Sequence, residues 1–173
     1  MGAISANHVR EDETGVAAVT EDALAAIPSG AVVTIDTAPV IYYLEDHPVY
    51  AERFAPVFDA IAAGRIQAVI SSVTLAEVLS GPLTSGQEIL AAQYREVLCR
   101  SGGWQMHPVD EEIAVTAARV RVRHKLRLPD AIQIATAIVT RSYALITHDR
   151  RLSKVGDVRI LGTGKHAPLR SQR

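Results

Sequence analysis

The sequence LPDAIQIATAIVTRSYALITHDRRL (128–152) joins one amphipathic helix to one short apolar strand. Its first half repeats apolar residues at the i, i+3, i+4, i+7 spacing of a helix face, as Ala131, Ile134, Ala135 and Ile138. Pro129 suits the first helical position. The run ALIT (144–147) predicts a buried strand because it is short, apolar and followed by polar residues. A helix that leads directly into a buried strand is typical of α/β proteins.

The same alternation continues on the N-terminal side. Four further apolar runs predict strands: AVVTI (31–35), IQAVI (66–70), WQMHPV (104–109) and VRIL (158–161). Helical spacing lies between them over residues 54–61 and 90–98, and Asp110 can cap a helix from 111 to about 125. Strands that alternate with long helices predict an α/β fold, in which helices flank both faces of a parallel β-sheet.

The length of 173 residues fits one domain. Residues 30–162 are predicted to form this domain. Residues 1–29 are predicted to be a partly flexible N-terminal extension, with a short helix near Glu21–Ile27 capped by Thr20. Residues 163–173 are predicted to be a basic C-terminal tail.

The composition excludes several classes of protein. Hydrophobic residues make up 48% of the chain and charged residues 21%, which is enough apolar material for a core and excludes disorder along the whole chain. No apolar run approaches the ~20 residues of a membrane span, and the N-terminus predicts no signal peptide. The single cysteine, Cys99, excludes an internal disulfide and a multi-cysteine zinc site. We therefore expect a cytoplasmic protein.

The net charge of -1 hides a strong asymmetry. Residues 1–99 contain 4 Lys and Arg and 13 Asp and Glu. Residues 100–173 contain 14 Lys and Arg and 6 Asp and Glu. This split is compatible with a surface that meets an anion, and equally with a dipolar protein that binds no anion, so alone it does not decide between them. Candidate phosphate contacts are Arg123 and Arg127 in the basic segment 119–127, and Arg150. Aromatic residues are only 5% of the chain, which does not suggest a base-stacking surface.

Four acidic residues occupy positions where α/β proteins build their sites. Asp36 follows the strand at 31–35, Glu77 lies one or two turns into the helix after 66–70, and Asp149 follows ALIT. Asp130 lies in the first turn of its helix. Ligands of open parallel sheets bind at the carboxyl ends of the strands, so these side chains are expected to meet.

Each acid also has a purely structural interpretation. Asp36 could cap the next helix, and Asp149 could be a turn residue. Thr74 and Glu77 have the spacing of a capping box. Asp130 is favoured in a first turn by the helix dipole.

If the four acids do converge, they need a counter-ion. Carboxylates in one cleft raise each other's pKa or recruit a cation, and oxygen ligands favour Mg²⁺ or Mn²⁺. Such an ion beside a basic surface indicates phosphodiester chemistry. Thr37 and Thr147 flank the acids and could orient water or phosphate. The sequence has neither a phosphate-binding P-loop nor a nucleophile elbow.

Four blocks resemble the acidic blocks of PIN-domain ribonucleases, and most of all those of VapC-type toxins from bacterial toxin–antitoxin pairs. The blocks are IDTAPVIYYLE (35–45), SSVTLAEVL (71–79), LPDAIQIATA (128–137) and THDRRL (147–152). The resemblance implies a parallel sheet sandwiched by helices and the metal-dependent hydrolysis of RNA. It also implies two partners, a second copy of the chain and a cognate antitoxin.

Carried over by position, the resemblance implies that Asp36, Glu77, Asp130 and Asp149 hold Mg²⁺ or Mn²⁺. It implies that Thr147 helps to shape the catalytic site, and it matches Thr37 to a common neighbour of the first acid. Ala38 departs from the family pattern, because many relatives carry Ser or Asn there.

Two alternatives to a ribonuclease remain at this stage. The domain could be a non-enzymatic binding module whose acids hold an ion or a basic peptide. It could also be a phosphohydrolase or phospho-acceptor domain centred on Asp36, although Ala38 removes the second acid of a D-x-D motif.

Overall fold

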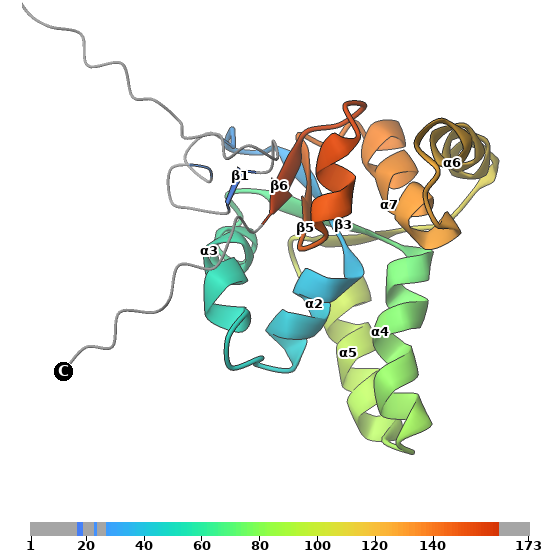
Figure 1. The fold of residues 1–173 in the computed structure, drawn as a ribbon. Coiled ribbons are helices and arrows are strands. Elements are labelled where there is room, and N and C mark those ends of the chain that lie inside the picture. The colour runs from blue at the N-terminus through green and yellow to red at the C-terminus, as the bar shows by residue number, and fades with distance from the viewer. Residues whose placement is uncertain (1–16, 19–22, 24–26, 163–173) are drawn as a thin grey trace, which may run out of the picture.

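The computed structural model describes residues 17–18, 23 and 27–162, and Figure 1 shows a twisted sheet with helices around it. Within these described residues the sheet has six strands, in the order β1-β6-β5-β2-β3-β4. Every pair of neighbouring strands is parallel. The strands are β1 (Ala17–Ala18), β2 (Val32–Ile35), β3 (Gln67–Ser71), β4 (Trp104–His107), β5 (Ala144–Thr147) and β6 (Ile160–Gly162). The predicted parallel α/β fold is confirmed.

Helices connect the strands, as a parallel sheet requires. They are α2 (Thr37–Leu44), α3 (Ala51–Ala62), α4 (Ser72–Thr84), α5 (Glu88–Arg100), α6 (Glu111–His124), α7 (Leu128–Val139) and the 3₁₀ helix η1 (Arg150–Lys154). None of the helices within the described residues is both long enough and apolar enough to cross a membrane.

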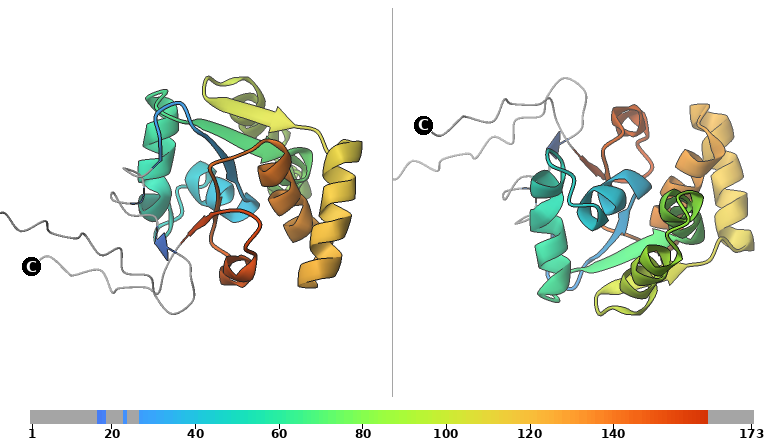
Figure 2. Two further views of the ribbon diagram at one scale, coloured as in Figure 1. Left: turned by 90° about the horizontal axis from the view of Figure 1, so that it is seen from above. Right: turned by 90° about the horizontal axis from the view of Figure 1, so that it is seen from below.

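Two hydrophobic cores lie on opposite faces of the sheet. One packs strand residues such as Val33 and Ile35 against Phe54 and its neighbours in α3, together with α2 and α5. The other packs Leu145 of β5 against α6, α7 and η1. The two views in Figure 2 show the sheet between these two groups of helices. This is a three-layer sandwich, in which both faces of the sheet are covered.

The strand order determines where a site can form. From β2 the chain moves outward to β3 and β4, and it then crosses back to place β5 on the other side of β2. The carboxyl ends of β2 and β5 are therefore the topological switch point, where open α/β sheets bind their ligands. The two ends are joined by a hydrogen bond, because the Asp36 N–H donates to the Ile146 carbonyl at 2.9 Å.

Several boundaries differ from the sequence-based expectations. The strand expected at 104–109 ends at His107, and the one expected at 158–161 lies at 160–162. Ala17 and Ala18, expected in a loose extension, form an edge strand paired with β6. Ile27 is buried in the larger core, so the packed body starts before residue 30. The expected helix near Glu21–Ile27, with Thr20 as its cap, lies largely outside the described residues, as does the tail 163–173.

Candidate active site

Asp36 stands at the centre of the switch point. It follows β2 and is the N-cap of α2, where its Oδ1 accepts the backbone N–H of Thr37 at 2.8 Å. Its Oδ2 accepts the Thr147 hydroxyl from the end of β5 at 2.6 Å. The capping role expected from the sequence is confirmed. The contact with Thr147 links the ends of β2 and β5 through two residues that are 111 positions apart in sequence.

The environment of Asp36 disfavours its charge. Burial raises the pKa of the Asp36 carboxyl above its ordinary value. The hydrogen bonds from Thr147 and the Thr37 N–H act against this, whereas the negative charges of Asp130 and Glu77 raise the pKa further. An acid kept in such surroundings is typical of a functional site.

Glu77 approaches Asp36 from α4. The N-cap of α4 is Ser71, whose hydroxyl accepts the Thr74 N–H at 3.0 Å, so the alternative interpretation of Thr74 and Glu77 as a capping box is wrong. Glu77 is instead an exposed residue one turn further along, and its Oε2 accepts the hydroxyl of Thr37. Thr37 therefore connects Asp36 and Glu77 through two hydrogen bonds. Its backbone N–H donates to Asp36, and its hydroxyl donates to Glu77.

A buried polar network supports this junction from behind. Gln133, which lies one turn after Asp130 on α7, is fully buried and donates to the Thr74 hydroxyl at 2.7 Å. It also donates to the Thr37 hydroxyl at 3.5 Å and accepts the Ser71 hydroxyl at 3.2 Å. The sequence reasoning missed this residue. A glutamine inside the apolar run AIQIA was the signal, because a buried amide needs partners.

Replacing Gln133 by leucine is expected to lower the free energy of unfolding by about 1–3 kcal/mol. Leucine has a similar volume, so the loss would come from the hydroxyls that the amide no longer pairs. Urea denaturation followed by circular dichroism would measure this loss. Gln93→Leu on the exposed side of α5 is the matched control and should change the stability by no more than about 0.5 kcal/mol. Equal effects of the two substitutions would contradict the assigned role of Gln133.

Asp149 and Asp130 share one cation. Asp149 caps η1, as its turn-residue interpretation required, and Arg151 reaches back to it with Nε 2.9 Å from Oδ2. The same guanidinium lies 3.6 Å from Asp130. Thr147 orients this side too, because its hydroxyl oxygen accepts the Asp149 N–H at 3.0 Å.

The pKa values of these two acids move in opposite directions. Hydrogen bonding to Arg151 is the largest influence on Asp149 and lowers its pKa. Burial is the largest influence on Asp130 and raises its pKa, while the charge of Arg151 opposes the shift and that of Asp149 adds to it. The ion pairs with Arg151 therefore compensate only part of the negative charge in the cleft.

The structure thus brings the four predicted acids into electrostatic reach of one another. Asp36 is influenced by Glu77 and Asp130, and Asp130 is influenced by Glu77 and Asp149. Within the described part of the chain, no group of three or more His, Cys, Asp or Glu side chains has the close spacing of a formed metal site. The four carboxylates nevertheless match the chemistry of a hard dication, since all of their donor atoms are oxygens.

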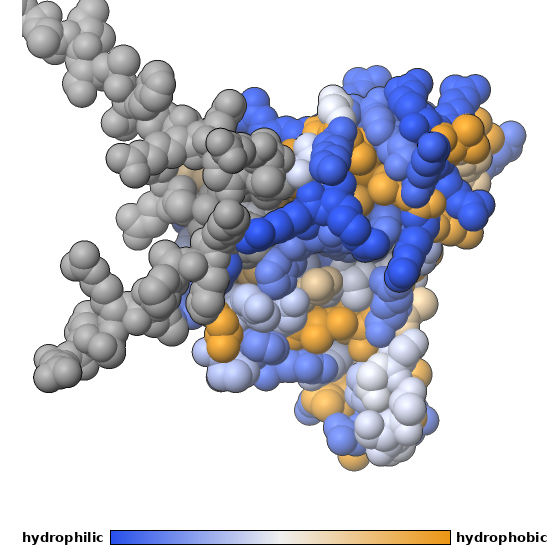
Figure 3. Space-filling view, in the orientation of Figure 1, coloured by the Kyte–Doolittle hydropathy of each residue, from blue (hydrophilic) through white to orange (hydrophobic). Residues whose placement is uncertain are grey.

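The predicted basic residues separate into different surroundings. Arg127 lies beside Asp130 in a pocket of about 330 Å³, which is lined by His124, Lys125, Leu126, Arg127, Asp130, Arg151, Lys154 and Val155. Arg123 pairs with Asp157 at 2.7 Å and is not among the residues that line this pocket. Figure 3 shows strongly hydrophilic residues in a broad band where η1, α7 and α2 come together. The pocket, with its four Lys and Arg side chains, is suited to a phosphate.

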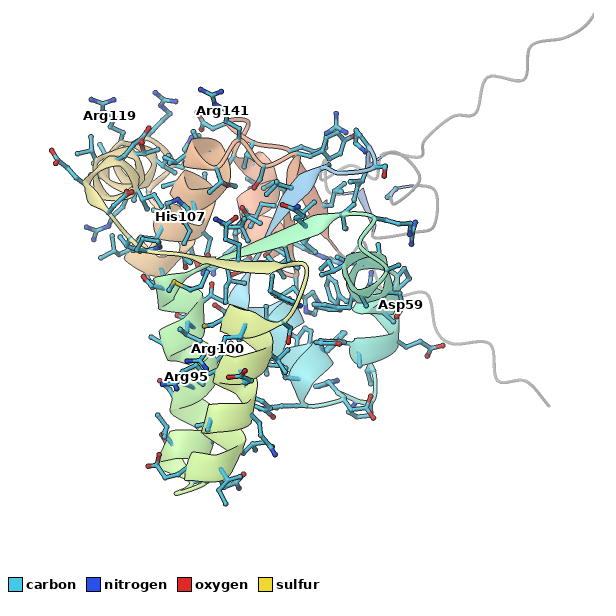
Figure 4. All side chains as sticks on the ribbon, turned by 180° about the vertical axis from the view of Figure 1, so that it is seen from behind. Asp59, Arg95, Arg100, His107, Arg119 and Arg141 are labelled. Carbon is cyan, nitrogen blue, oxygen red and sulfur yellow. The ribbon has the colours of Figure 1, made fainter. Side chains whose placement is uncertain are left out.

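The remaining arginines near this segment point elsewhere. Figure 4 shows Arg119 on the outer surface of α6 and Arg141 beyond the end of α7, both directed away from the body of the protein. Arg141 follows the C-terminal end of α7, whereas Asp130 lies at its N-terminal end. Only part of the basic sequence 119–127 can therefore serve the acidic cleft.

Aromatic side chains gather around His148, the residue before Asp149. His148 lies between Thr147 and Asp149 in sequence, and its Nδ1 is 2.9 Å from the hydroxyl of Tyr42. Burial lowers the pKa of His148, and the nearby charges of Arg53 and Arg150 lower it further. The sequence reasoning missed this arrangement, because a low aromatic content says nothing about how the few rings are distributed.

Comparisons with known proteins agree with the fold. The family model described as PIN domain matches residues 33–158. A comparison with curated proteins finds no match. Among solved structures, a toxin–antitoxin complex from Klebsiella pneumoniae is similar with a TM-score of 0.59 and 24% identity, over 78% of this chain and 99% of that one.

Two further structures are similar to this chain. VapBC2 from Rickettsia felis, bound to a DNA fragment from its promoter, has a TM-score of 0.61 at 13% identity, over 76% of this chain and 98% of that one. VapC20 from Mycobacterium tuberculosis, a toxin that cleaves the sarcin–ricin loop, has a TM-score of 0.58 at 14% identity, over 73% of this chain and 98% of that one. At these identities the likeness supports the fold. The family match spans most of the chain, and on that ground the protein belongs to the PIN domain family.

Proposed function

We propose that this protein is a metal-dependent endoribonuclease and the toxin of a toxin–antitoxin pair. One observation carries the proposal: Asp36 is held by two hydrogen bonds at the switch point of the sheet, in reach of the charges of Glu77 and Asp130. Acids gathered in this way cost stability, so their presence favours a function over a structural role. The similar toxin structures support the same assignment.

Asp36, Glu77, Asp130 and Asp149 would hold the Mg²⁺ or Mn²⁺ ion. Arg151 already sets one positive charge against Asp149 and Asp130, which supports the view that these acids need a counter-charge. A bound dication would lower the pKa of an attacking water and offset the charge of the phosphate in the transition state.

The chain's own residues would position the two reactants. Thr147 and the N–H of Thr37 fix both oxygens of the Asp36 carboxylate, so its remaining lone pairs have a defined direction. Arg127 and the other cations of the adjoining pocket would bind an RNA phosphate next to Asp130. A preorganised carboxylate beside a phosphate-binding pocket is what phosphodiester hydrolysis requires.

The proposed partners follow from the same assignment. Toxin–antitoxin complexes are among the similar structures, so we propose that a cognate antitoxin binds this chain. We also propose a homodimer and a cytoplasmic location, both of which remain predictions.

A cleavage assay on single-stranded RNA tests the proposal. Cleavage is expected with Mg²⁺ or Mn²⁺, and its loss is expected when EDTA removes the metal. Because water rather than the ribose 2′-hydroxyl would attack, the products should lack a 2′,3′-cyclic phosphate. A 2′-deoxy substitution at the cleaved position should also leave the reaction measurable.

Each contrary result points to a different function. Binding of metal or of a partner without cleavage of any RNA would favour the non-enzymatic module. Release of phosphate from simple phosphomonoesters would favour a phosphohydrolase centred on Asp36. Cleavage that persists in EDTA and requires the 2′-hydroxyl would contradict the metal-dependent mechanism.

A further inference from the structure

Five rings form a compact cluster beside the acidic cleft, and we call it the ring cluster: Tyr42, His47, Tyr50, Phe54 and His148. Tyr42 pairs with all four of the other rings, and the centroid of the Tyr50 ring lies 4.8 Å from that of Tyr42, 4.8 Å from that of His47 and 4.5 Å from that of His148. The rings come from α2, the α2–α3 connection, α3 and the end of β5, so only the tertiary fold assembles them.

The ring cluster has a buried base and a partly exposed rim. Phe54 is completely buried, whereas Tyr42, His47, Tyr50 and His148 each keep part of their surface in solvent. Rings that are fixed from below but remain accessible from above can accept another planar group.

The ring cluster lies next to the acids. His148 stands between Thr147 and Asp149, and Tyr42 lies on α2, the helix that Asp36 caps. The Tyr42 hydroxyl is 2.9 Å from His148 Nδ1, and the charge of Asp36 is among the influences that raise the pKa of Tyr42, after burial and Tyr50. A ligand on these rings would therefore be a close neighbour of a group bound at the acids.

Two arginines flank the ring cluster. Arg150 is exposed on η1, and Arg53 lies one turn after Tyr50 on α3. Burial lowers the pKa of Arg53, and the positive charge of Arg150 lowers it further, which indicates that the two cations are near neighbours. The charges of both arginines also lower the pKa of His148, so both cations lie near the ring cluster.

Packing does explain part of the ring cluster. His47 Nδ1 accepts the backbone N–H groups of Val49 at 3.2 Å and Tyr50 at 3.3 Å, which holds the α2–α3 connection in place. The buried Phe54 serves the core. The partly exposed rim of the ring cluster is not explained by that role.

We propose that the ring cluster is a subsite that stacks one unpaired nucleobase of a single-stranded RNA, while Arg53 and Arg150 contact its phosphates. Rings supply a stacking surface for bases, and arginines contact the backbone. The pocket that includes Asp130 has four cations and no tyrosine among its lining residues, which suits contacts with the RNA backbone but not stacking on bases. The strand would run from the ring cluster, across the acids, to this pocket. The inference rests on the proposed ribonuclease function.

The test uses the full chain with Asp36→Asn, so that bound RNA stays intact, and compares three tyrosine variants in that background. Fluorescence anisotropy measures the Kd for a labelled single-stranded 12-nucleotide RNA in Mg²⁺. Tyr50→Leu is expected to weaken binding by about tenfold or more, and Tyr50→Phe is expected to keep most of the affinity, since the ring does the stacking. Tyr43→Leu is the matched control, because Tyr43 is an exposed tyrosine of α2 that stacks on Phe58, outside the ring cluster.

A salt titration separates stacking from charge. Tyr50→Leu should leave the slope of log affinity against log salt unchanged, whereas Arg150→Gln should reduce its magnitude by about 0.7. In the same RNA, 2-aminopurine is placed at each position in turn. At one position of the RNA, the 2-aminopurine emission should fall when the RNA binds to the Asp36→Asn protein with Tyr50 intact. At the same position the emission should be retained when the RNA binds to the variant that also carries Tyr50→Leu.

The outcomes are distinguishable. If the parent chain cleaves RNA but Tyr50→Leu binds as tightly as Tyr43→Leu, the subsite is wrong and the ribonuclease stands. Equal losses for Tyr50→Phe and Tyr50→Leu would also overturn stacking. If Tyr50→Leu does not fold, a position-specific loss of 2-aminopurine emission with Tyr50→Phe supports the subsite, and its absence overturns it. A parent chain that neither binds nor cleaves RNA overturns both proposals.

Discussion

Asp36→Asn is expected to reduce RNA cleavage by on the order of 10³-fold or more, because preorganised charge at the reacting centre is usually worth that much. The fold should survive. Asparagine is also a good N-cap, so its side-chain oxygen can still accept the Thr37 N–H. Initial rates on single-stranded RNA in Mg²⁺ measure the loss. Asp59→Asn on α3, an exposed acid on the reverse face in Figure 4, is the matched control and should cleave like the parent.

The same substitution should stabilise the protein at neutral pH when no divalent cation is present. The pKa of the Asp36 carboxyl is higher in the folded state than in the unfolded state. The protonated carboxyl therefore makes its full contribution to the free energy of unfolding only at a pH below the unfolded-state pKa. That contribution is lost as the pH rises through the pKa of Asp36 in the folded state, and the ionised, buried carboxylate then destabilises the fold. We expect the Tm advantage of Asp36→Asn to grow with pH, by about 2–4 °C for each kcal/mol of relief. A Tm that falls at neutral pH would contradict this account of Asp36.

Thr147→Val is expected to slow cleavage by about 10- to 100-fold, the usual effect of removing a group that orients a metal ligand. Valine keeps the shape of the buried side chain but removes the hydroxyl that donates to Asp36 and accepts the Asp149 N–H. The hydrogen bond from Thr147 lowers the pKa of Asp36, so its loss should raise that pKa. The acidic limb of the pH–rate profile should move to higher pH, and the defect should be largest at the acidic end.

Thr147→Ser provides the control for this prediction. Serine keeps the hydroxyl and should restore the pH profile, even if the lost methyl group lowers the stability. A Thr147→Val profile that is reduced equally at every pH would show that Thr147 acts only through packing.

Sequence reasoning reached the acids because their positions follow from local rules. Asp36 directly follows one buried strand and Asp149 lies two residues after another, and parallel strands deliver such residues to one edge of the sheet. The same reasoning left two interpretations of Glu77 open, because the spacing of Thr74 and Glu77 also fits a capping box. The choice between the two depends on where α4 begins, and Ser71 decides that.

The basic residues were harder to assign. Arg123 and Arg127 are four positions apart in one basic segment, yet one pairs with Asp157 and the other lines the pocket beside Asp130. Helix α6 ends at His124 between them, and Lys125 adopts a left-handed backbone conformation that turns the chain. Helical spacing therefore cannot relate the two arginines.

The sequence alone determined the α/β class, the approximate order of strands and helices, and the positions of the four acids, because periodicity and strand ends are local properties of the chain. Only the tertiary structure decided that Gln133 supports Thr37, that Arg151 bridges Asp130 and Asp149, and that the ring cluster forms at all. These contacts join residues far apart in sequence, such as Tyr42 and His148, which are separated by 106 positions. Their side-chain directions depend on how the helices pack on the sheet, and no local pattern encodes that packing.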